Sequence, residues 1–126
     1  MIFFVDRSIG AVHVPNALRK VGEQVVLLDD EFPEDVMDEV WIDRVGEKGW
    51  IALTKDQGIR RRPFEVESFL RSTARVFIFA SGNTPGPMMA EVIVKALPAI
   101  KNIVHSTRPP FLGRIEKSGR VSLFTS

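Results

Sequence analysis

The 126-residue sequence contains no cysteine, only two histidines and no long apolar run. The missing cysteines exclude disulfides, thiolate metal sites and a cysteine nucleophile. Two isolated histidines argue against a histidine-rich metal cage, so any metal would be held by oxygen ligands. A helix needs roughly 20 apolar residues to cross a bilayer, and the N-terminal segment has no basic stretch ahead of an apolar one. We therefore expect one soluble, cytoplasmic domain over residues 1–126, without a membrane partner.

The net charge of +1 conceals an uneven distribution of charge along the chain. Residues 1–55 carry 6 Lys or Arg against 11 Asp or Glu, whereas residues 56–126 carry 11 against 5. Such a division suits a protein whose acidic part concentrates cations while its basic part meets an anionic polymer.

Apolar runs alternate with helical patterns along the chain. The runs that predict strands are residues 2–5, 24–28, 50–53 and 75–80, and the helical patterns cover residues 15–21, 35–48, 63–72 and 85–105. This alternation predicts an α/β fold with a mainly parallel central sheet. Residues 111–115 and 120–124 predict a closing C-terminal hairpin.

Single residues predict where these helices begin and which faces they bury. Asp35 and Thr84 are predicted N-caps, and Pro98 is expected to kink or split the last helix. The residues expected to face the core are Met37, Val40, Trp41, Val45, Phe64, Val66, Phe69, Leu70, Met88, Val92, Ile93, Ala96, Leu97, Ile100 and Val104.

Three of the predicted strands end in carboxylates, at Asp6, at Asp29 and Asp30, and at Asp56. Parallel strands present their carboxyl ends on one edge of a sheet, so Asp6 and Asp56 are expected to converge in one cleft. Asp38 precedes Trp41 by about one helical turn, so it can border a buried face and point toward the strand ends.

Carboxylates without histidine or cysteine form a hard-oxygen site that suits Mg²⁺ or Mn²⁺. Such an ion can activate water and neutralise charge on a phosphodiester. The basic cluster around Asp56 suits phosphate binding, because each Lys or Arg contact adds sequence-independent affinity. A solvated loop in which Asp56 only caps a helix is the simpler alternative. The cluster consists of Lys55, Arg60, Arg61 and Arg62.

Three segments together resemble the PIN-like nuclease domains. They are V-D-R-S at residues 5–8, D-E-V-W-I at residues 38–42 and L-T-K-D at residues 53–56. The resemblance is closest to the VapC-type toxins of bacterial and archaeal toxin–antitoxin pairs, and it extends from residue 2 through the long helix, leaving the hairpin outside. It implies a three-layer PIN-like fold, a Mg²⁺- or Mn²⁺-dependent endoribonuclease, an RNA substrate and a cognate antitoxin, and it leaves a homodimer open.

The resemblance also implies roles for individual residues. The catalytic and metal-binding positions are Asp6, Asp38 and Asp56, the supporting positions are Thr54, Ser8 and Glu39, and the RNA-binding positions are Lys55, Arg60, Arg61 and Arg62.

One feature departs from the usual PIN pattern, which has a further acid on the helical segment after the first strand. Residues 14–21 read V-P-N-A-L-R-K-V and contain none. Asp29, Asp30 or Glu39 could stand in, or the site holds a single, weaker ion. Two other functional classes stay open: a non-catalytic module that binds RNA or an antitoxin, and a receiver-like phosphoacceptor domain. The second would use Asp56 as acceptor but lacks a Lys after the fourth strand.

Overall fold

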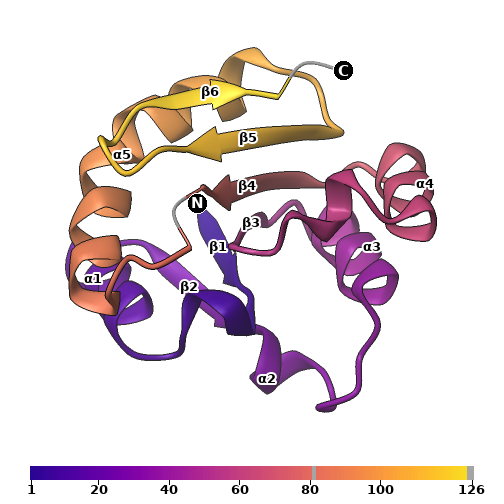
Figure 1. The fold of residues 1–126 in the computed structure, drawn as a ribbon, viewed down its shortest axis with the longest axis horizontal. Helices are drawn as coiled ribbons and strands as arrows, with labels where there is room; N and C mark the ends of the chain where they lie inside the picture. Colours follow the sequence, from indigo (N-terminus) through magenta and orange to yellow (C-terminus); the bar gives the residue numbers. More distant parts are fainter. Residues whose placement is uncertain (81, 125–126) are drawn as a thin grey trace.

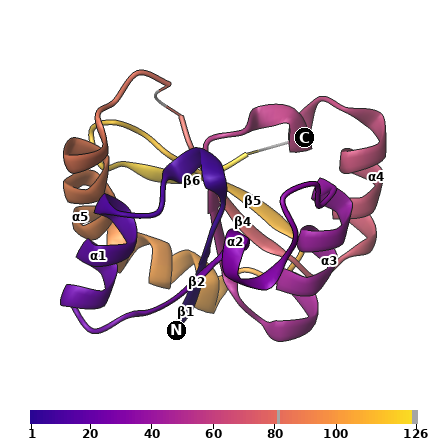
Figure 2. The same ribbon diagram turned by 90° about the horizontal axis from the view of Figure 1, so that it is seen from below.

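The computed structural model describes residues 1–80 and 82–124, which form one six-stranded sheet with helices on both faces (Figures 1 and 2). The order across the sheet is β2-β1-β3-β4-β5-β6, with all neighbours parallel except the antiparallel pair β5 and β6. The predicted α/β class, mainly parallel sheet and C-terminal hairpin are confirmed. The strands are β1 Ile2–Val5, β2 Gln24–Leu27, β3 Ile51–Thr54, β4 Arg75–Phe79, β5 Phe111–Ile115 and β6 Val121–Leu123.

The helices divide between the two faces of the sheet. Helices α1 and α5 lie together on one side, and α3 and α4 lie on the other (Figure 2). None of the described helices is both long enough and apolar enough to span a membrane. The α-helices are α1 His13–Lys20, α2 Leu28–Glu31, α3 Asp38–Lys48, α4 Pro63–Arg71 and α5 Gly86–Ser106, and the short 3-10 helices are η1 Arg7–Ile9 and η2 Gln57–Arg60.

Strand β1 is buried on both faces because its side chains alternate between two apolar cores. Phe3 and Val5 face the core under α1 and α5, whereas Phe4 faces the core under α3 and α4. The Phe4 ring stacks on Trp41 of α3 at 5.5 Å and on Trp50 at 5.9 Å between centroids. Buried aromatic pairs of this kind add about 0.5–1.5 kcal/mol beyond area burial. They fix the start of α3 against β1, next to the strand ends.

Two predicted helix starts are wrong. Helix α3 begins at Asp38 with Met37 at the N-cap, so Asp35 is not the cap. The chain makes a turn first, in which the N–H of Val36 donates to the carbonyl of Pro33 at 3.1 Å, and this turn takes up the residues expected in the first helical turn.

Helix α5 differs from the prediction in the same way. It begins at Gly86 with Pro85 at the N-cap, so Thr84 does not occupy that position. The helix runs as one element through Pro98, which therefore does not split it. Strand β2 also ends one residue earlier than predicted, and the four residues of α2 follow, so Asp29 and Asp30 lie in a short helix.

The predicted inward faces are partly confirmed. The expected residues that are half-buried are Val66, Val92 and Val104. Those that are buried are Trp41, Val45, Phe69, Ile93, Ala96, Leu97 and Ile100. Helix α3 is turned so that its buried residues are Trp41, Ile42 and Val45, and α4 buries an acid beside its aromatic ring. Hydrophobic spacing alone could not give this rotation. The residues that were expected inside but are exposed are Met37, Val40, Phe64, Leu70 and Met88.

Candidate active site

The neighbouring strands β1 and β3 bring Asp6 and Thr54 into direct contact. Val5 pairs with Leu53 in the parallel ladder, so the residues that follow them lie side by side. The N–H of Asp6 donates to the carbonyl of Leu53 at 3.1 Å. The hydroxyl of Thr54, which is fully buried, donates to Oδ2 of Asp6 at 2.8 Å. The register of the sheet therefore positions this carboxylate.

Further hydrogen bonds tie the loop after β1 to the loop after β3. Ser8 Oγ donates to Oδ2 of Asp6 at 2.6 Å and lies 3.2 Å from Oγ1 of Thr54. Ser8 Oγ accepts from the N–H of Lys55 at 2.9 Å, and Thr54 Oγ1 accepts from the N–H of Asp56 at 3.0 Å. Thr54 and Ser8, both predicted to be supporting residues, thus connect Asp6 to Asp56.

Asp56 uses its two carboxylate oxygens differently. Oδ1 accepts from the N–H of Gly58 at 2.8 Å and so caps η2, as the simpler alternative expected. Oδ2 accepts from Nη2 of Arg62 at 2.6 Å. The same nitrogen lies 3.4 Å from Oδ2 of Asp38, and Nε of Arg62 pairs with Glu65. One guanidinium therefore joins three acids.

Asp38, the first residue of α3, is held by the aromatic core. Its Oδ1 accepts from Nε1 of Trp41 at 2.8 Å, and Trp41 is 1% exposed. Asp38 borders the buried face, as its spacing from Trp41 predicted. It meets Asp56 through Arg62, and Asp6 is linked to Asp56 through Thr54. Over residues 1–80 and 82–124, however, no three acidic, histidine or cysteine side chains form a group that could hold a metal ion by themselves.

Glu65 of α4 is a member of this network that was not among the predicted site residues. It is 8% exposed, and it pairs with Arg62 three positions earlier. Burial raises the pKa of Glu65 to about 7; a hydrogen bond with Asp38 acts in the same direction and Arg62 opposes both. The sequence could have indicated that Glu65 faces the interior, because Glu65 precedes the core residue Phe69 by four positions and so lies on the same face of the helix.

Asp29 and Asp30, which could have stood in for the missing acid, are exposed in α2. Asp29 forms an ion pair with Arg7, and this hydrogen bond raises the pKa of Arg7. Asp29 nevertheless lines the same hollow as Asp6, at the ends of β1 and β2. Asp29 therefore lies near Asp6, but its carboxylate is paired with Arg7.

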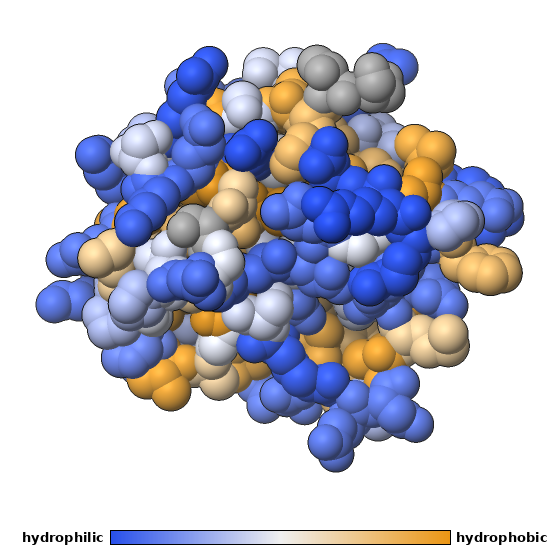
Figure 3. All heavy atoms as spheres, viewed as in Figure 1, coloured by the Kyte–Doolittle hydropathy of each residue, from blue (hydrophilic) through white to orange (hydrophobic). Residues whose placement is uncertain are grey.

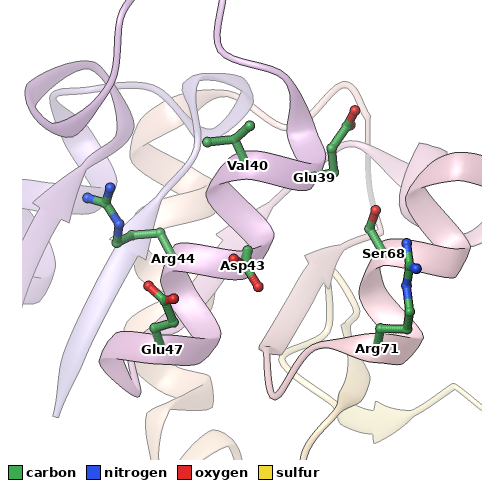
Figure 4. A pocket seen from close by; sticks show the side chains of 7 residues that line it. All are labelled: Glu39, Val40, Asp43, Arg44, Glu47, Ser68 and Arg71. Carbon is green, nitrogen blue, oxygen red and sulfur yellow. The ribbon is translucent and has the colours of Figure 1, made fainter.

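Glu39 follows Asp38 directly in α3. It lines a hollow between α3 and α4 together with other side chains of these two helices, among them Asp43 and Arg71 (Figure 4). Over residues 1–80 and 82–124, no side-chain hydrogen bond or ion pair joins Glu39 to Asp6, Asp38 or Asp56. Its supporting role stays a prediction.

The predicted basic cluster is divided in the structure. Lys55 Nζ donates to the carbonyl of Gly82 at 2.9 Å. The Arg60 guanidinium carbon lies 3.9 Å from the centroid of the Phe124 ring, and Arg61 is exposed. Arg62 is turned toward the acids instead. Figure 3 shows a broad hydrophilic surface on this face of the molecule, on the side toward α4. Arg60 and Arg61 are both exposed.

Comparisons with known proteins find two matches. A family model described as "PIN like domain" matches residues 1–81, which include strands β1 to β4 and every acid of the network. A curated protein of Mycobacterium tuberculosis named "Putative ribonuclease VapC45" is 36% identical over 110 residues, covering 84% of this chain and 80% of that protein. No solved structure matches.

Proposed function

Because this chain belongs to the PIN-like domain family, we propose that it is a metal-dependent endoribonuclease and the toxin of a toxin–antitoxin pair. The observation that carries the proposal is the network in which Thr54 and Ser8 hold Asp6 and connect it to Asp56. These hydroxyls fix the orientation of a carboxylate at the open end of a buried sheet, where α/β folds place their ligands.

The residues of the network fit Mg²⁺ or Mn²⁺. The network's acids and hydroxyls offer only oxygen ligands, which these ions prefer. One oxygen of Asp38 and one of Asp56 already lie within 3.4 Å of a single positive group, Nη2 of Arg62. Mg²⁺ usually takes only one or two carboxylates and keeps several waters, so this pair suffices for one ion.

The chain's own residues supply positioning and phosphate affinity. Asp38 is held by Trp41, and Asp6 is held by Thr54 and Ser8, so little ordering remains when a ligand arrives. A divalent ion bound here supplies neutralisation of charge at the phosphodiester and activation of water. Arg60 and Arg61 attract the RNA backbone without regard to sequence.

The experiment that tests this proposal compares RNA cleavage by wild type, Asp6→Asn and Asp56→Asn in Mn²⁺. Both substitutions should remove most of the activity while the thermal unfolding temperature stays within a few degrees of wild type. Asp30→Asn is the matched control, because Asp30 is an exposed acid of α2 outside the network, and it should cleave as wild type does. Full activity in both Asp6→Asn and Asp56→Asn would contradict the proposed site.

The proposed partner is a cognate antitoxin protein, supported by the similarity to a protein named VapC. Induction of this chain in cells should arrest growth, and co-expression of a small reading frame directly beside its own should relieve the arrest. The Asp6→Asn variant is the control and should not arrest growth. An RNA substrate also accords with the cytoplasmic location that the sequence predicts.

A non-catalytic module that binds RNA or an antitoxin is the second candidate. Two observations favour it: Arg62 lies between Asp38 and Asp56, and the described part of the chain has no three-acid metal group. Such a module would bind RNA equally in Mn²⁺ and in EDTA and would not cut it. The receiver-like alternative is set aside, because the family match is to the PIN-like domain.

A further inference from the structure

The guanidinium of Arg62 is placed as a cation among the acids of the candidate site. Nη2 lies 2.6 Å from Oδ2 of Asp56 and 3.4 Å from Oδ2 of Asp38, while Nε pairs with Glu65. The planar fork of an arginine can contact several carboxylates at once, which a lysine ammonium cannot do with the same geometry. The hydrogen bonds to Glu65 and Asp56 raise the pKa of Arg62, so it stays charged.

Gly58 provides the space in which this guanidinium lies. A Cβ atom at position 58 would stand 1.9 Å from Nη2, 2.1 Å from Cζ and 2.6 Å from Nε of Arg62. The three nearest atoms to such a Cβ therefore all belong to the end of one flexible side chain. The φ of Gly58 is not positive, so its backbone conformation is open to other residues. What the glycine supplies at this position is room for Arg62.

The position of Arg62 has an electrostatic consequence for ion binding. A divalent ion bound to Oδ2 of both Asp38 and Asp56 would compete with Nη2 of Arg62 for the same two oxygens. Two cations bound to the same pair of oxygens would repel each other, so the ion and the guanidinium exclude one another. Occupation by the guanidinium also relieves the repulsion between the carboxylates while no ion is present.

We propose, building on the metal-dependent function above, that Arg62 is a positioning residue that the divalent ion displaces from the site. In the ion-free protein, its guanidinium holds Asp38 and Asp56 in place. When the ion binds, the side chain swings outward, which its 53% exposed surface permits, and it becomes free to contact an RNA phosphate. The apparent ion affinity of the wild type then equals the affinity of the open site multiplied by the fraction of molecules in which Arg62 lies outside it.

The test is isothermal titration calorimetry with Mn²⁺ alone, without RNA. Gly58→Ala keeps every charge but pushes the guanidinium out, and Arg62→Gln removes it. Both variants should bind Mn²⁺ about tenfold more tightly than wild type, since the competing cation is gone. Arg61→Gln is the matched control, because it removes an adjacent, exposed positive charge and should change the affinity little at an ionic strength that screens distant charges.

The outcomes separate this inference from the proposed function. If wild type binds Mn²⁺ but Gly58→Ala and Arg62→Gln bind no more tightly than Arg61→Gln, Arg62 is a structural ion-pair partner and the inference is wrong. If neither wild type nor any variant binds Mn²⁺, the metal-dependent function fails as well. Circular dichroism establishes that each variant is folded, and Arg62→Gln alone decides the matter if Gly58→Ala is not.

Discussion

The hydroxyl of Thr54 donates a 2.8 Å hydrogen bond to Asp6, 48 positions earlier in the chain. The same oxygen accepts the N–H of Asp56 at 3.0 Å. Thr54 is the last residue of β3, and its full burial prevents water from replacing either bond. Through these two bonds, a single threonine holds in place the two acids that follow β1 and β3.

Replacing Thr54 should separate the role of its hydroxyl from that of its methyl group. Thr54→Val keeps the shape but leaves Asp6 and the N–H of Asp56 without this partner. We expect the free energy of unfolding to fall by about 1–3 kcal/mol, and RNA cleavage to fall with it because Asp6 loses its orientation. Thr54→Ser keeps the hydroxyl and should retain most of the activity. Urea unfolding and cleavage rates check this, and a Val variant as stable and active as wild type would contradict it.

The neighbouring positions of the ends of β1 and β3 could be predicted from the sequence. Asp6 and Asp56 each follow an apolar run short enough to be a strand buried on both faces. Parallel strands end on one edge, so the contact of Asp6 with Thr54 follows from topology. Asp38 was also located correctly, because its spacing from Trp41 placed it at the border of a buried helix face.

The contacts made by α4 could not be predicted in the same way. Hydrophobic spacing pointed to Phe64 and Leu70 as core residues, yet both are exposed, while Glu65 is buried. Glu65 lies on the same face as the buried Phe69, where it meets Arg62 and Asp38. Such ion pairs depend on tertiary geometry, which a count of apolar residues does not contain. Arg62, expected to face RNA, lies among the acids for the same reason.

Asp38 should contribute to stability through Trp41. The Nε1 of Trp41 is in a buried ring and donates to Asp38 Oδ1 at 2.8 Å. Asp38→Ala leaves this donor unpaired and should lower the free energy of unfolding by about 1–3 kcal/mol. Asp38→Asn keeps an acceptor for Trp41 and should cost less, although both variants should bind Mn²⁺ more weakly. Chemical denaturation in EDTA measures the difference, and equal losses in the two variants would show that Trp41 does not depend on this bond.

Glu65 should make the stability of the ion-free protein depend on pH. Its pKa is raised by burial from 4.5 to about 7, so the folded state binds a proton that the unfolded state has lost over this range. The free energy of unfolding should therefore decrease as pH rises from about 4.5 to about 7. Glu65 should account for roughly 1–3 kcal/mol of this decrease in the free energy of unfolding.

Glu65→Gln cannot titrate, so it provides the reference for this pH dependence. The difference in unfolding free energy between wild type and Glu65→Gln, measured in EDTA, should change in favour of the variant as pH rises through this window. Glu67→Gln is the matched control, because Glu67 is an exposed acid on the same helix. A difference that stays constant from pH 4.5 to pH 7 would show that Glu65 is ionised in the folded protein.

Arg60 and Arg61 should account for part of the RNA affinity. In the double variant Arg60→Gln, Arg61→Gln, binding should weaken for all RNA sequences. The slope of log K against log[salt] should flatten by roughly 0.7 for each phosphate that the variant no longer neutralises. Filter binding at several salt concentrations, with EDTA present to prevent cleavage, measures both quantities. Loss of affinity for particular sequences at an unchanged slope would mean that these arginines read bases.

The most direct measurement is RNA cleavage by the purified chain as a function of divalent ion. Wild type should cut RNA in Mg²⁺ or Mn²⁺, should stop when EDTA is added, and should resume when the ion is restored in excess. Asp56→Asn, prepared in parallel to reveal any contaminating ribonuclease, should remain inactive throughout. Undiminished cleavage in EDTA by wild type, with an inactive Asp56→Asn control, would contradict a metal-dependent mechanism.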